Sequence, residues 1–84
     1  MTRLSLLPVD AKARVVLLSP ALRGSAERLA GLGLFPGSEL ALLQKRPTFV
    51  VEAGETRVAL DPAVARQIFV QRLAEEAGPW PESP

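Results

Sequence analysis

The chain has 84 residues, 48% of them hydrophobic, with ten basic and nine acidic side chains and a formal net charge of +1. It contains neither cysteine nor histidine, which excludes disulfides, zinc fingers, thiol catalysis and histidine acid–base chemistry. This composition is sufficient for one small core and lacks the basic excess of nucleic-acid-binding proteins.

We expect no targeting signal in the first residues. No apolar run approaches the length of a membrane span, and Pro8 interrupts "MTRLSLLPVD" too early for a signal peptide. Pro8 and Asp10 together mark a turn before the first strand. We therefore expect a soluble, cytoplasmic protein.

The next two segments differ in their apolar period. Residues 12–18, "KARVVLL", are short and contain adjacent β-branched residues, which predicts a strand. After it the apolar residues recur at helical spacing, with Ser19 as the N-cap and Pro20 in the first turn. Gly24 and Gly31 weaken this helix, so it must depend on packing. The residues expected on its buried face are Leu22, Ala26, Leu29 and Ala30.

The stretch "LAGLGLFPGSELALL", residues 29–43, predicts a helix end, a sharp turn and a strand start in close succession. Gly33 suits the left-handed residue that terminates a helix, and Leu34 falls where a Schellman motif packs its apolar residue back against Leu29. In "FPGS", Pro36 and Gly37 occupy the central positions of a type II turn. Residues 38–46 then form a strand, with Leu40 and Leu42 on one face and Ala41 and Leu43 on the other.

A hairpin follows in "TFVVEAGETRVAL", residues 48–60. A two-residue loop, Gly54-Glu55, suits a type II′ turn and fixes the register of the two strands. Glu52 then lies opposite Arg57 as a favourable cross-strand pair. The apolar pairs on the other face are Val51 with Val58 and Phe49 with Leu60.

The last elements are a helical turn and a closing strand. Asp61 is the expected N-cap of the turn, with Pro62 first inside it, and residues 68–73 form the strand. Residues 1–74 are thus one domain, and the polar, proline-rich residues 75–84 are a flexible tail. Five short strands, a helix inserted between the first two and a short helical turn before the last predict an all-β, partly open small barrel.

The order of these motifs resembles the ferrous iron transport protein A (FeoA) family. The likeness runs through residues 4–73, from "LSLLP" and "ARVVLL" to "ERLAGLGLFPGSELALLQKRP" and "TRVALDPAVARQIFV". Its most specific pieces are Leu32, Gly33 and Leu34 followed by Pro36 and Gly37, and then Ala59 and Leu60 with Ala65 and Ile68.

The resemblance implies an SH3-like barrel and a non-catalytic, accessory role beside the bacterial membrane GTPase that imports ferrous iron. The protein would meet the membrane only through this partner. The module is also similar to the C-terminal domain of iron-dependent repressors, so the alternative is a stand-alone regulatory domain of that kind. Against it stand the missing helix-turn-helix and the lack of basic excess, and we expect no nucleic acid as a partner. An enzyme is disfavoured, because no nucleophile–base pair, phosphate loop or paired catalytic carboxylates appear.

No cofactor is required by this interpretation, and no metal ligand can be assigned. The FeoA family is described as binding transition metals, which leaves weak divalent binding open. Glu52, Glu55 and Asp61 are the carboxylates that could form a hard-cation site. Arg57 opposite Glu52 and the capping position of Asp61 give two of them ordinary structural roles.

Two apolar residues are not assigned to the barrel interior, Leu22 near the helix start and Phe35 at the turn. With Arg23 and Arg28 on the outer helix face, they have the composition of an interface core with a polar rim. We therefore predict that these four residues bind the partner, although an outer helix face is more often ordinary solvated surface. The same patch could pair two copies of the chain.

Overall fold

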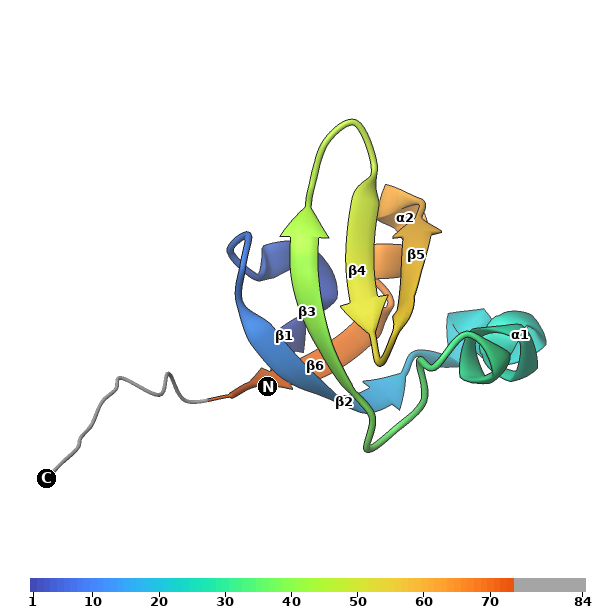
Figure 1. Ribbon diagram of the computed structural model, residues 1–84. Coiled ribbons are helices and arrows are strands. Elements are labelled where there is room, and N and C mark those ends of the chain that lie inside the picture. The colour runs from blue at the N-terminus through green and yellow to red at the C-terminus, as the bar shows by residue number, and fades with distance from the viewer. Residues whose placement is uncertain (74–84) are drawn as a thin grey trace, which may run out of the picture.

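Six strands form one antiparallel sheet in the order β1-β6-β2-β3-β4-β5, curled into a small barrel (Figure 1). The computed structural model describes residues 1–73, so the predicted tail, residues 75–84, lies outside the described residues. The strands are β1 (Thr2–Arg3), β2 (Lys12–Leu18), β3 (Glu39–Gln44), β4 (Phe49–Ala53), β5 (Thr56–Leu60) and β6 (Ile68–Arg72). The helical segments are the 3₁₀ helices η1 (Leu4–Leu6) and η2 (Pro20–Ser25) and the α-helices α1 (Ala26–Gly31) and α2 (Pro62–Ala65).

The five predicted strands are confirmed, and one strand was missed. β1 has only two residues, too few to show an apolar period, and it pairs Thr2 with Val70 and Arg3 with Phe69 of β6. β2 holds the barrel together, because it pairs with β3 along its first half and with β6 along almost its whole length.

The β4–β5 hairpin has the predicted register. Val51 lies opposite Val58, Phe49 opposite Leu60 and Glu52 opposite Arg57. Gly54 has a φ of 63° in the two-residue loop, which only glycine adopts easily. The Arg57 Nε lies 3.8 Å from the Glu52 Oε2, and such an exposed pair contributes little to stability.

The barrel interior is filled by apolar side chains alone among the described residues. β3 buries Leu40 and Leu42 as predicted, and Ala41 and Leu43 on its other face are only half-buried. The buried residues within positions 1–73 are Leu4, Leu7, Ala11, Ala13, Val15, Leu22, Leu29, Leu34, Leu40, Leu42, Phe49, Val51, Ala53, Val58, Leu60, Ala65, Ile68 and Val70.

The segment between β2 and β3 begins as a 3₁₀ helix, where one continuous α-helix was expected. Ser19 caps it as predicted, since its Oγ accepts a hydrogen bond of 3.2 Å from the Ala21 N–H. The 3₁₀ turns run to Ser25, and only then does α1 begin. Gly24 lies next to the point where the 3₁₀ turns give way to the α-helix, and it favours the 3₁₀ turns because glycine is a poor α-helix former. The expectation that Ala30 is buried was wrong, since Ala30 is exposed.

The end of α1 is the predicted Schellman motif. The Leu34 N–H donates to the Leu29 carbonyl oxygen at 2.8 Å, and the Gly33 N–H donates to that of Ala30 at 3.0 Å. Gly33 has a φ of 96°, and Leu34 is fully buried in the same core cluster as Leu29.

The turn after α1 is also as predicted. Gly37 has a φ of 98°, and the Ser38 N–H donates to the Phe35 carbonyl oxygen at 2.9 Å. The Ser38 hydroxyl donates to the same oxygen at 2.8 Å and accepts from the Phe35 N–H at 3.1 Å. The turn therefore closes on itself and directs the chain into β3.

The predicted capping role of Asp61 is only half right. Asp61 occupies the N-cap position of α2, and its carbonyl oxygen accepts from the Ala65 N–H at 3.0 Å. Its carboxylate, however, makes no capping hydrogen bond.

We predict that Gly33→Val destabilises the fold and that Gly24→Ala does not. At Gly33 a Cβ would lie 3.2 Å from the Ala53 Cβ, and the positive φ adds about 1–2 kcal/mol for any residue with a Cβ. At Gly24 a Cβ would meet nothing within 4 Å. Thermal melts should show a fall of about 8 °C or more for Gly33→Val only. Equal losses in the two variants would contradict the Schellman motif.

A groove between the inserted helix and strand β5

The segment between β2 and β3, residues 19–38, is here called the insertion. It leaves the barrel at one end, and α1 lies beside the β4–β5 hairpin (Figure 1). Ser19 fixes its start, while Leu22, Leu29 and Leu34 anchor it in the barrel core. The insertion is therefore packed as part of the barrel.

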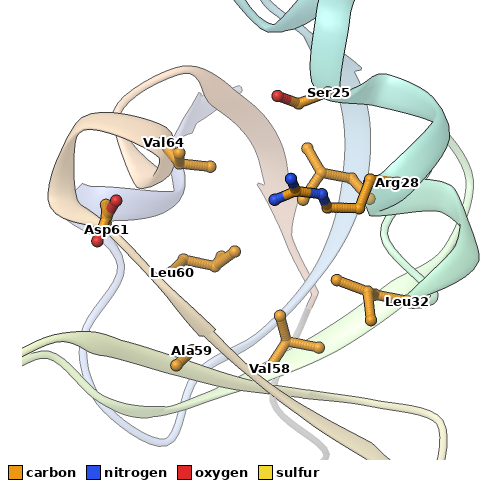
Figure 2. Close-up of a pocket in the computed structure, with 9 residues that line it drawn as sticks. Ser25, Arg28, Leu32, Val58, Ala59, Leu60, Asp61 and Val64 are labelled. Carbon is orange, nitrogen blue, oxygen red and sulfur yellow. The ribbon is translucent and has the colours of Figure 1, made fainter.

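A groove of about 170 Å³ separates the insertion from β5 and α2 (Figure 2). Its base is apolar, because Leu29, Val58 and Leu60 are all buried. Higher on the walls, Leu32 keeps 36% of its surface exposed and Val64 is half-buried. The lining residues are Ser25, Arg28, Leu29 and Leu32 on one wall and Val58, Ala59, Leu60, Asp61 and Val64 on the other.

Two opposite charges face this groove from its two walls. Figure 2 shows the Arg28 side chain extending from α1 into the groove, and the Asp61 carboxylate on the far side at the end of β5. Within the described residues neither side chain takes part in an ion pair, whereas Arg14 binds Glu39 at 2.7 Å. Both charges are thus available to a ligand.

The structure separates the four residues predicted to bind a partner. Arg23 and Arg28 are exposed, and Arg28 lines the groove. Phe35 is 45% exposed, but it faces a different hollow, of about 460 Å³, on the other side of Gly33. Leu22 is 7% exposed and lies in the core, as its place on the apolar helix face predicted, so it is not available to a partner at the surface.

The residues missed from the sequence lie on the opposite wall of the groove. Ala59 and Val64 are small apolar residues whose place beside α1 depends on how the barrel curls. Asp61 directly follows a strand, and this position is the one feature of the sequence that could have placed it at the site. Its expected capping bond had instead given it a structural role.

The carboxylates of the described residues do not form a metal centre. Nowhere in residues 1–73 do three or more aspartates or glutamates come together as potential ligands. Glu52 pairs with Arg57, Glu39 pairs with Arg14, and Asp61 is the single carboxylate in the groove. With no cysteine or histidine in the chain, a transition metal has no favoured ligand here.

A family model, the FeoA domain, matches residues 2–72. The chain belongs to the FeoA family. The match includes both walls of the groove and the whole insertion. No curated protein matches this FeoA chain.

Solved structures of other FeoA proteins have the same SH3-like fold. The FeoA of Stenotrophomonas maltophilia, solved in complex with zinc, is 31% identical with a TM-score of 0.72, over 84% of this chain and 91% of that one. It is described as an SH3-domain protein and as a candidate activating factor of bacterial ferrous iron transport. The FeoA of Chlorobium tepidum is 27% identical with a TM-score of 0.77, over 95% of this chain and 81% of that one.

The same barrel occurs within larger repressors. IdeR of T. acidophilum matches 84% of this FeoA chain with a TM-score of 0.77 and 22% identity, which shows the fold alone. The chain corresponds to 33% of IdeR. In the described residues of this FeoA protein, none of the helices has the length and apolar character needed to cross a membrane.

We predict that Leu22→Asp unfolds the protein or costs about 3 kcal/mol or more, whereas Phe35→Ser changes the free energy of unfolding by less than about 0.5 kcal/mol. The first variant places a charge at a core position, and the second removes an exposed ring. Urea denaturation followed by circular dichroism measures both values. A well-folded Leu22→Asp protein would contradict the burial of this leucine.

Proposed function

We propose that this FeoA protein is a cytoplasmic, non-catalytic binding module of ferrous iron uptake. In this role it docks on the cytosolic region of the membrane GTPase that transports ferrous iron and modulates it. The observation that carries the proposal is the FeoA match over residues 2–72, together with the likeness to S. maltophilia FeoA.

The chemistry of the surface supports binding over catalysis. The groove offers a guanidinium, a carboxylate and an apolar base, and neither cysteine nor histidine exists in the chain. Exposed Leu32 and Phe35 lie on either side of Gly33, close to a β-hairpin. Apolar residues with charged neighbours are typical of protein interfaces.

A second candidate is a regulatory domain that acts with a transcription factor. The shared barrel of IdeR favours it. The formal net charge of +1 disfavours any direct contact with DNA, because few phosphate counterions could be released.

We predict that transporter binding depends on Phe35. In a pull-down with the cytosolic region of the transporter, with and without guanine nucleotide, Phe35→Ser should bind about tenfold more weakly than wild type. Val9→Ser is the matched control, because Val9 is 46% exposed and lies in the loop between η1 and β2, away from α1 (Figure 1). Absence of wild-type binding would overturn the proposed function. Normal binding by both variants would exclude Phe35 from the docking surface.

We further predict no tight binding to DNA or RNA. A gel-shift titration at moderate salt should show no complex, since the chain lacks the charge to neutralise several phosphates. A tight complex that weakens steeply with salt would favour the regulatory candidate.

A further inference from the structure

Strand β5 is the last strand of the sheet, and within the described residues only β4 pairs with it. In a hairpin with a two-residue loop, the pair that flanks the loop exchanges hydrogen bonds, and the pattern then alternates. Thr56, Val58 and Leu60 therefore direct their backbone groups toward β4. The backbone N–H and C=O groups of Arg57 and Ala59 point the other way, toward the open edge.

This open edge adjoins the groove. Ala59 lines the groove and is exposed. Arg57, the other residue with outward backbone groups, is also exposed. An unpaired row of N–H and C=O groups is recognised by an extended polypeptide backbone, which adds as one more strand. The apolar base next to it, formed by Leu29, Val58 and Leu60, would receive a side chain of such a strand.

The charges on the walls define the segment further. Arg28 extends from α1 into the groove, and Asp61 lies at the end of β5 (Figure 2). Neither has an ion-pair partner among the described residues, so each can pair with a residue of opposite charge on a bound segment. A segment that follows β5 would bring an acidic residue to Arg28 and a basic residue to Asp61.

We propose that the groove binds a short extended segment of the partner protein, which pairs with the β5 edge between β5 and α1. This inference rests on the proposed function, in which the partner is the cytosolic region of the ferrous iron transporter. The segment has about five residues, to match the 5 residues of β5. It carries an apolar residue for the base of the groove, an acidic residue for Arg28 and a basic residue for Asp61.

A second copy of the chain fits this edge less well. The groove is a confined space of about 170 Å³ with α1 on its far side, which leaves no room for a second folded domain. Another β5 edge would bring a whole sheet and a second α1 to the same place. We therefore assign the edge to a partner segment.

The test uses two substitutions with matched controls, measured by titration of the full chain with the transporter's cytosolic region. Ala59→Pro removes the outward N–H, which an edge strand tolerates, and its control Ala59→Thr keeps that N–H. Arg28→Glu reverses the charge in the groove. Its control, Arg46→Glu, makes the same charge change in the exposed loop between β3 and β4. Hydrogen exchange of the Arg57 and Ala59 amides is measured in the free and bound states.

We expect Ala59→Pro and Arg28→Glu to bind about tenfold more weakly, with both controls close to wild type. The amides of Arg57 and Ala59 should exchange rapidly in the free protein and slowly in the complex. If Ala59→Pro fails to fold, amide hydrogen exchange and the binding of Arg28→Glu still test the proposal.

Wild-type binding that neither substitution weakens, with unchanged amide exchange, would overturn this inference and leave the proposed function intact. Absence of wild-type binding would overturn both. A wild-type dimer that Ala59→Pro converts to a monomer would assign the edge to a second copy and also overturn the inference.

Discussion

The position of the insertion against the barrel depends on the backbone conformation of Gly33. Its φ of 96° ends α1, and its N–H and that of Leu34 satisfy two carbonyl groups of the last helical turn. The Ala53 Cβ lies so close that a Cβ on residue 33 would meet it at 3.2 Å. The same glycine therefore turns the chain and lets the hairpin approach α1. Because α1 and β5 form the two walls of the groove, this one contact sets its position.

The β5 edge is built to avoid uncontrolled pairing. Natural proteins protect exposed edges with short strands and charged residues, and β5 has 5 residues, including Arg57. Beyond the strand, α1 stands along one side and the charge of Asp61 marks one end. These features disfavour association with any long apolar strand. A short segment with matching charges can still pair with the edge. The features that protect the edge therefore also make it selective.

The sequence predicts those parts of the fold that local geometry determines. The loop at Gly54 fixes the hairpin register, because a two-residue turn permits only one alignment and a slip would expose the core face. The apolar period placed Leu22 on the buried face of the insertion, and its burial agrees with that period. Its assignment to the partner surface was wrong, because the packing of the first turn of the insertion on the barrel is not encoded locally. At the candidate site, Arg28 could be named from its exposed helical position. Asp61 and Ala59 could not, because their approach to α1 arises from the curl of the sheet, which no local pattern encodes.

The insertion is anchored in the barrel core, and this anchoring affects how the protein can bind a partner. Leu22, Leu29 and Leu34 belong to the same core as the barrel strands, and each buried leucine contributes about 1.5–3 kcal/mol. Separating the insertion from the barrel would expose all three, so the groove exists before any ligand arrives. A preformed site needs little reorganisation on the protein's side, and only side chains such as Arg28 must be ordered. The ordering cost then falls on the extended segment of the partner. That cost keeps a short contact weak and reversible, which agrees with the proposed role of modulating a transporter.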